Sequence, residues 1–277
     1  MSTSINSNIL AITAQRNIQR TQSDLDTALT RLSSGLRINY AWDDPAGLAV
    51  SERFRAQIES MTEAERNANY NVNLLATAEG ALQTIDDSLS RMRALAIQAS
   101  NGALASQDRV ALDLEFQQLA SEITRIAQTT NYNGLNLLDG TYSLNGLKFH
   151  IGTYNVSGQD YYYVTIGDMS SSALGLGGLN LLTTLSAQNA INSIDTAINT
   201  KDNERTRIGS QVSRLQNTIE NLQVASENAI SSESAIRDAD IAEEMSAFVR
   251  AQLLMETGVS MLSQANMVPQ IVAGLVG

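Results

Sequence analysis

Few side chains in this sequence could carry out chemistry. His150 is the single histidine among 277 residues, and cysteine is absent. These two facts exclude disulfides, zinc–thiolate sites, iron–sulfur clusters, thiol catalysis and the helical H-E-x-x-H zinc site. Carboxylates cluster twice, at Asp43-Asp44 and at Asp238–Glu244. Either cluster could bind a metal or transfer protons, but both stand where a helix is expected to begin. We therefore interpret them as helix caps that complement the helix dipole.

Two other segments could be interpreted as binding sites, but their residues do not support that interpretation. Asn131–Asn136 lacks the Asp ligands and the terminal Glu that a calcium loop needs. The run Tyr161–Tyr163 could stack against a ligand, but such a run more often packs a hairpin against helices. The sequence thus predicts no catalytic residue, no metal ligand and no cofactor.

Composition favours long packed helices over a compact enzyme. The net charge of −11 argues against binding a nucleic acid backbone, which needs a basic face. Only two residues are proline, so helix breakers are rare. Only 5% of the residues are aromatic, which is few for a single large hydrophobic core. No run of 18 apolar residues predicts a membrane-spanning helix. Residues 1–20 lack the pattern of a cleavable signal peptide.

The elements that must position these residues are helices, because apolar residues recur at alternating spacings of three and four. Each helix has a stop or start signal, such as Gly35 after the first and Asn101-Gly102 after the second. The sequence predicts a first helix ending near Gly35 or at Asp43-Asp44, a second over 46–100, a third from 106 to about 133, a fourth over 186–234, and a fifth from 240 that closes at Pro269.

The composition changes between about residues 140 and 185, where eight of the 17 glycines lie. Leu147–Ile151 and Tyr161–Ile166 read as two strands around a turn at 155–159, and Ser170–Gly178 reads as a loop. The fold class follows: mainly α, a long antiparallel helical bundle or coiled coil built from both chain ends, with a small β-hairpin region in the middle.

The two chain ends carry apolar seams without a globular core of their own. Residues 1–42 carry a net charge of +2 and residues 239–277 a net charge of −3. Opposite charge favours pairing of the ends with each other or with neighbouring copies. The seam residues could therefore form an intramolecular core or an assembly contact between subunits. They are Ile18, Leu25, Leu29, Leu32, Leu36, Ile241, Met245, Phe248, Met255, Val259 and Leu262.

Several blocks, in order, resemble bacterial flagellins. At the N-terminal side these are Leu32–Asn39, Asp43–Ala49, and Asn133-Gly134 followed by Leu137–Gly140. At the C-terminal side they are Ile236–Glu244 and Gln264–Gln270. The resemblance covers about 1–140 and 186–277, and the large variable outer domains of longer flagellins are missing.

The resemblance implies a secreted, non-enzymatic subunit of the extracellular flagellar filament. It further implies an inner coiled-coil region, D0, at 1–43 and 239–277, and a surrounding region, D1, at 44–238. The implied partners are further copies of the chain, an export chaperone, the filament cap and hook-associated proteins. A flagellar hook–filament junction protein, which shares the terminal helices, is the alternative.

A second resemblance concerns Leu89–Gln98, which is similar to the flagellin segment recognised by toll-like receptor 5. It implies that Arg91, Leu95, Gln98 and Glu122 are recognised by this receptor. Ala94 departs from the pattern, because many activating members have an acid there. The alternative is that Leu95 lies near a core seam and that the charges are simply solvated.

Overall fold

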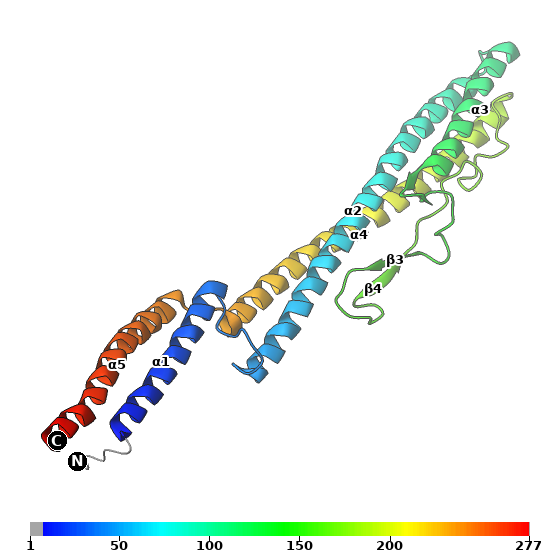
Figure 1. The fold of residues 1–277 in the computed structure, drawn as a ribbon. Helices are drawn as coiled ribbons and strands as arrows, with labels where there is room; N and C mark the ends of the chain where they lie inside the picture. The colour runs from blue at the N-terminus through cyan, green and yellow to red at the C-terminus, as the bar shows by residue number, and fades with distance from the viewer. Residues whose placement is uncertain (1–7, 277) are drawn as a thin grey trace. The chain divides into compact units, whose positions relative to one another are not determined.

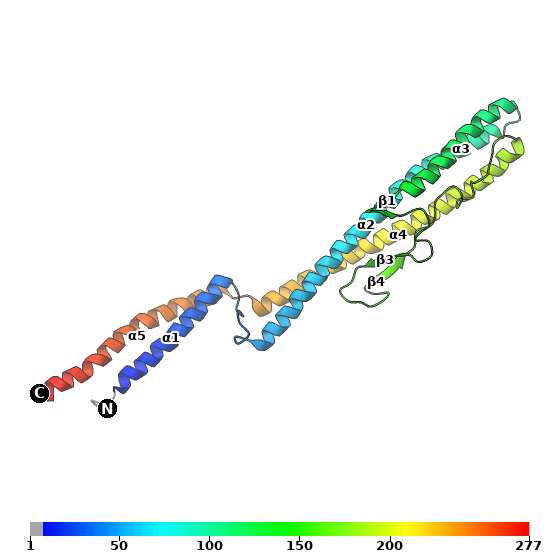
Figure 2. The ribbon, with the colours of Figure 1, turned by 45° about the vertical axis from the view of Figure 1, so that its right-hand side comes forward.

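A computed structural model of the chain describes residues 8–276, with the side chains of residues 8–267. It divides into two compact units. The first combines both chain ends, residues 1–58 and 228–277, and the second is the continuous stretch 59–227. The boundaries fall inside two long helices, α2 (Pro45–Ala99) and α4 (Thr184–Arg237). Mainly helical architecture is thus confirmed, and it is drawn in Figures 1 and 2.

The second unit is a bundle of α2, α4 and the shorter α3 (Ser106–Thr129), which run along one another in every view. Arg93 with Asp195 and Arg205 with Glu79 show that α2 and α4 are antiparallel. The predicted apolar seam of α2 forms the centre of the core. From Leu75 to Ala99, every seam residue is fully buried: Leu75, Ala78, Leu82, Ile85, Leu89, Met92, Ala96 and Ala99.

Two small antiparallel sheets follow α3. The predicted hairpin is confirmed, with β3 (Leu147–His150) paired to β4 (Tyr161–Val164). Alternate residues of the hairpin face inward, so Phe149 and Val164 are buried while Tyr163 is exposed. His150 stacks on Tyr161 in this hairpin, at 6.0 Å between ring centroids.

A second hairpin was missed by the sequence analysis. β1 (Asn131–Tyr132) pairs with β2 (Leu135–Asn136) around Asn133-Gly134, where φ is 51° and 81°. Positive φ at both central residues belongs to the tight hairpin turn that Asn-Gly favours. The third helix therefore ends at Thr129, and the Asn-Gly pair turns two strands instead of stopping that helix.

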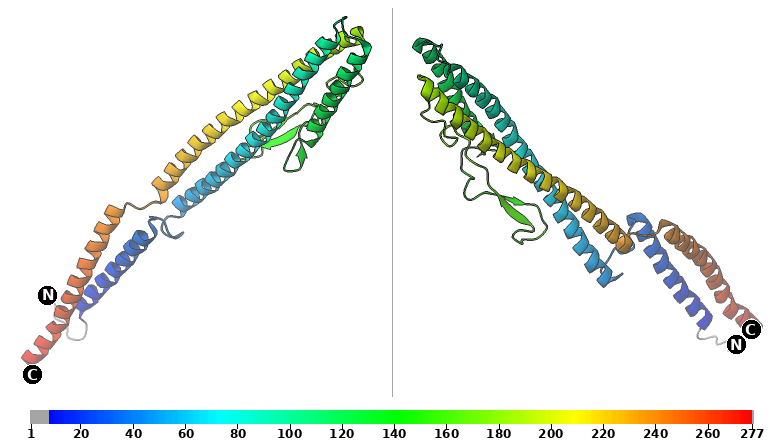
Figure 3. Two further views of the ribbon diagram at one scale, coloured as in Figure 1. Left: turned by 90° about the horizontal axis from the view of Figure 1, so that it is seen from above. Right: turned by 180° about the vertical axis from the view of Figure 1, so that it is seen from behind.

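In the first unit, α1 (Ile9–Ser34) and α5 (Ile241–Val276) lie side by side, as the two views of Figure 3 also show. Gly35 ends α1 in a left-handed conformation with φ 72°, which a glycine adopts without steric cost. The prediction that the last helix closes at Pro269 is wrong, because α5 continues to Val276. Proline supplies no amide hydrogen and so removes one backbone hydrogen bond from the helix, yet the helical conformation continues beyond it.

Candidate assembly interface

The pair formed by α1 and α5 has an inner face built on alternating spacings of three and four. On α1 this stripe is buried or half-buried and consists of Ala11, Ala14, Ile18, Thr21, Leu25, Ala28 and Leu32. On α5 the matching stripe consists of Glu244, Phe248, Ala251, Met255, Gly258, Leu262 and Ala265. This periodicity keeps one face of each helix against the other along their length.

Small residues allow the two helices to approach closely. Ala28 and Ala251 are 3% and 6% exposed, although most of α1 and α5 is open to solvent. A Cβ atom placed on Gly258 would lie 2.9 Å from Cγ1 of Ile18. Glycine at this position therefore leaves room for the isoleucine of the opposite helix.

Polar contacts at both ends of the helix pair set its register. Near one end, Arg31 donates to Glu244 at 2.9 Å. Near the other, the side-chain amide of Asn8 donates to the carbonyl of Ala265 at 2.7 Å. The helices are therefore antiparallel. A charge-assisted contact combined with a buried small-residue seam fixes one alignment better than apolar contact alone.

The two segments that lead into this pair are hydrogen-bonded to each other. The backbone N–H of Arg37 donates to the carbonyl of Arg237 at 2.7 Å, and that of Ala239 donates to the carbonyl of Gly35 at 2.9 Å. These bonds hold together two parts of the chain that are about 200 residues apart in sequence.

The carboxylate clusters cap helices and turns. Asp44 accepts from the N–H of Gly47 at 2.9 Å at the start of α2. Asp240 accepts from the N–H groups of Ala242 and Glu243 at the start of α5. Asp43 accepts from the N–H groups of Asn39 and Tyr40 in the preceding loop.

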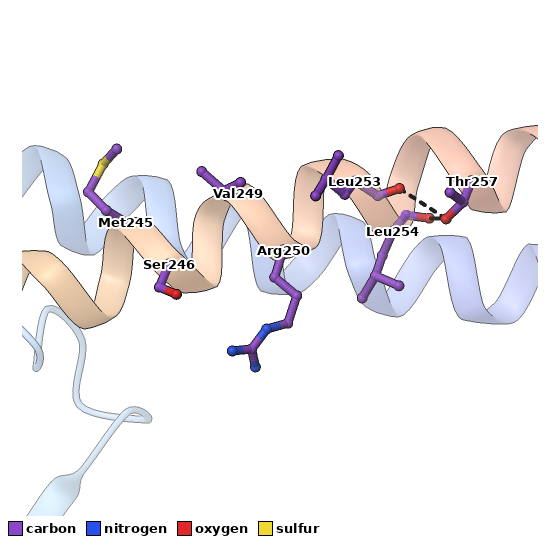
Figure 4. A pocket seen from close by; sticks show the side chains of 7 residues that line it. All are labelled: Met245, Ser246, Val249, Arg250, Leu253, Leu254 and Thr257. Carbon is purple, nitrogen blue, oxygen red and sulfur yellow. Dashed lines mark hydrogen bonds between the residues drawn. The ribbon is translucent and has the colours of Figure 1, made fainter.

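The outer face of α5 is also apolar. A shallow groove of about 640 Å³ runs along it and is drawn in Figure 4. Met245, Val249 and Leu253 project from the same side of the helix in that view and are 46%, 46% and 57% exposed. Ser246, Arg250, Leu254 and Thr257 complete the lining. A helix that is apolar on opposite faces is normally buried on both, so one face still lacks its partner.

The predicted seam residues divide between these two faces. Facing inward or half-buried are Ile18, Leu25, Leu32, Leu36, Phe248, Met255 and Leu262. Half or nearly half exposed are Leu29, Ile241, Met245 and Val259. Sequence reasoning missed the inner Ala251 and Gly258, because the predicted seam passed from Phe248 to Met255 and then to Val259, and it missed the outer Val249 and Leu253.

The four residues expected to be recognised by the receptor lie in the second unit. Arg91 pairs with Glu115 of α3 at 2.7 Å, and Gln98 is exposed. Leu95 is 1% exposed and belongs to the core. Glu122 pairs with Arg125, one turn further along α3, and the hydrogen bond from that arginine lowers the pKa of the Glu122 carboxyl. The structure therefore brings Arg91 beside Glu115 and leaves Glu122 with its own helical neighbour.

Within residues 8–267, no three His, Asp or Glu side chains gather so as to hold a metal ion. No helix in the described part of the chain is long and apolar enough to cross a membrane.

Comparison with known proteins gives a consistent result over most of the chain. Residues 5–143 match the bacterial flagellin N-terminal helical region, and residues 191–276 match the bacterial flagellin C-terminal helical region. A flagellin of Halalkalibacterium halodurans is 42% identical over 98% of each chain. The flagellar filament core protein flaB2 of Brachyspira hyodysenteriae is 39% identical, covering 96% of this chain and 97% of that protein.

Among solved structures, one from Vibrio parahaemolyticus described as a flagellar hook-associated protein superimposes with a TM-score of 0.58. It is 16% identical and covers 71% of this chain and 100% of that chain. At this identity the likeness concerns the fold alone.

Proposed function

The chain belongs to the bacterial flagellin family, and from that membership we propose how its terminal helices build the filament. The protein is the filament subunit of the bacterial flagellum, located in the flagellum, and it is a structural protein without enzymatic activity. In our proposal the outer apolar face of α5 packs against a neighbouring subunit, while its inner face stays paired with α1.

The observation that carries this proposal is the exposed apolar stripe Met245–Val249–Leu253 on a helix whose other face is already covered. Within the described part of the chain, these three side chains remain about half exposed. Burying apolar side chains stabilises an assembly by about 25 cal/mol for each Å² removed from water. A contact repeated from subunit to subunit without closure produces a helical polymer.

The domain assignment follows the same logic. We assign residues 1–43 and 239–277 to the inner region D0, and 44–238 to the region D1 with its hairpin. The ends of the helix pair support this division. Gly35 ends α1, and Asp240 caps the start of α5.

The finer partners are also proposals. An export chaperone would cover the apolar outer face of α5 before assembly, and the filament cap and hook-associated proteins would meet the same terminal helices at the two ends of the filament. The alternative role as a hook–filament junction protein has less support, because flagellar filament proteins match nearly the whole length of this chain.

The test is polymerisation of purified subunit, seeded or salted out and observed by electron microscopy. Val249→Asp with Leu253→Asp places charge on the outer stripe and should abolish long filaments, while circular dichroism keeps the helix content of the unmodified chain. The control is Ser260→Asp, an exposed polar position on the same helix. Normal filaments from the double variant would overturn the proposal.

The predicted seam residues give a second pair of variants. Leu29→Asp with Leu32→Asp, or Val259→Asp with Leu262→Asp, should also block filament growth while the second unit stays folded. Because Leu32 and Leu262 face inward, these variants should additionally loosen α1 from α5, which the outer variant should not.

A second role is suggested by the resemblance of Leu89–Gln98 to the receptor-recognised flagellin segment, in which Arg91 and Gln98 are exposed. We propose that toll-like receptor 5 recognises the monomeric chain at the α2–α3 surface around Arg91 and Gln98. Leu95 would support this surface from beneath, since it is buried.

A further inference from the structure

The loop between α1 and α2 carries an exposed aromatic pair. The rings of Tyr40 and Trp42 stack with centroids 4.5 Å apart and an interplanar angle of 14°. They are 49% and 77% exposed. A tryptophan held this far out of the protein gains little for the folded subunit, whereas tryptophan is among the residues that contribute most at interfaces.

This pair borders a pocket of about 170 Å³ between the loop and one side of α1. At about 30 Å³ for each water in the liquid, the pocket has room for one planar side-chain head group. Ser23, Thr27, Thr30 and Asn39 provide polar walls.

The pocket carries negative charge. Asp26 and Asp43 line it, and so does Arg31, whose charge is already matched by Glu244. Asp43 uses Oδ2 to accept from Asn39 and Tyr40, and Asp26 uses Oδ1 to accept from Gln22. Among residues 8–267, the other oxygen of each of these two carboxylates has no hydrogen bond. Two available carboxylate oxygens beside an aromatic face fit a cation with several donors.

We propose that this pocket receives the guanidinium group of an arginine from a neighbouring copy of the chain in the filament. The proposal rests on the filament role given above. Arginine fits better than lysine, because its planar head stacks on aromatic rings and presents five donors to carboxylates.

The chain itself supplies suitable arginines. Arg16 and Arg20 on α1, Arg53 on α2 and Arg250 on α5 are exposed, and none of them forms an ion pair among residues 8–267. An uncompensated arginine on a filament subunit next to an uncompensated acidic pocket is the charge complementarity that fixes how copies align.

Trp42 is the only tryptophan, so its fluorescence reports the pocket directly. In unmodified full-length chain, acrylamide should quench Trp42 readily in the monomer and much less in the filament. Trp42→Leu should raise the critical concentration for polymerisation by about 5- to 30-fold, since a desolvated cation–π contact is lost. Tyr70→Leu removes another exposed aromatic, which lies outside the pocket, and should leave the critical concentration unchanged.

The arginine is identified by four single variants, R16K, R20K, R53K and R250K, which keep the charge and change the head group. One of them should raise the critical concentration and add little on top of Trp42→Leu, because both remove the same contact. Asp26→Asn should act in the same direction, with Asp24→Asn on the same helix as its control.

The outcomes distinguish a failure of the pocket inference from a failure of the proposed filament role. If long filaments form and Trp42 remains as accessible to acrylamide as in the monomer, the pocket inference is overturned and the filament role stands. The inference is also overturned if Trp42 becomes protected while none of the four lysine variants couples to it. If the unmodified chain forms no filaments under any seeding condition, the assembly proposal fails and the pocket inference fails with it.

Discussion

Lys201 of α4 forms an ion pair with Asp86 of α2 at a seam position where the apolar pattern calls for a hydrophobic side chain. Its side chain is 2% exposed, and Asp202 lies within 2.8 Å of the same ammonium group. One turn on, Arg205 pairs with Glu79. A buried polar residue within an otherwise apolar seam can set the register of two helices at some cost in stability.

This relationship predicts a large loss when only one partner is removed. Lys201→Ala should lower the free energy of unfolding by about 3 kcal/mol, the lower end for breaking a buried pair, because Asp86 keeps contact with water. Lys201→Met combined with Asp86→Leu should recover most of the loss. Urea unfolding followed by circular dichroism measures both.

The control for this pair is Arg66→Ala, whose ion pair with Glu63 has more than half of both side chains exposed. It should leave the midpoint nearly unchanged, as exposed pairs generally do. Equal losses from Lys201→Ala and Arg66→Ala would contradict the importance of burial.

The hydroxyl of Tyr162 gives a pH-dependent prediction. It is buried without a hydrogen-bond partner within the described residues, while its ring contacts Phe149 and Arg214. Burial raises the pKa of Tyr162 above its usual value of 10, and the charge of Arg214 opposes this in part. The stability from the neutral hydroxyl is therefore complete below pH of about 10 and is lost as the pH rises through the higher folded-state pKa.

Tyr162→Phe keeps the ring and removes the group that ionises. It should be neutral or stabilising by up to about 1–3 kcal/mol, the cost of an unsatisfied buried polar group. It should also weaken the loss of stability as the pH rises above about 10. Thermal unfolding at pH 8 and pH 11 measures both effects, and a marked loss at pH 8 would show that the hydroxyl has a partner.

Gly258 predicts a selective effect on the terminal helix pair. Gly258→Leu should push Ile18 aside and separate α1 from α5, which limited proteolysis would detect as faster cleavage of the ends while the 59–227 unit persists. Gly80→Ala is the matched control, because nothing lies within 4 Å of the added Cβ. That change should stabilise α2 by up to about 1 kcal/mol through helix propensity.

The receptor proposal is checked with a cell reporter for toll-like receptor 5. Pure monomer should activate it, and Arg91→Ala should weaken activation, because it removes the charge and the contact with Glu115. Arg125→Ala, which disturbs Glu122 instead, should have less effect. A monomer without activity would refute the proposal.

Part of this fold could be predicted from local pattern alone. The alternating spacings along α4 place every seam position from Ile191 to Ala229 in a buried or half-buried site. Cap residues and Gly35 also marked the helix ends, because each acts through hydrogen bonds within a few residues of the chain. The hairpin of β3 and β4 was also predictable from the local residue pattern of its two strands.

What the sequence could not determine was which of two apolar stripes on α5 meets α1. Both Phe248 and Val249 are apolar, and a helical period assigns neither to the inside. The tertiary structure decides through Ala251 and Gly258, whose small size permits the close approach, and through the ion pair of Arg31 with Glu244. Periodicity is a property of one helix, whereas the facing side and the pairing of charges depend on the surface that the rest of the chain brings opposite it.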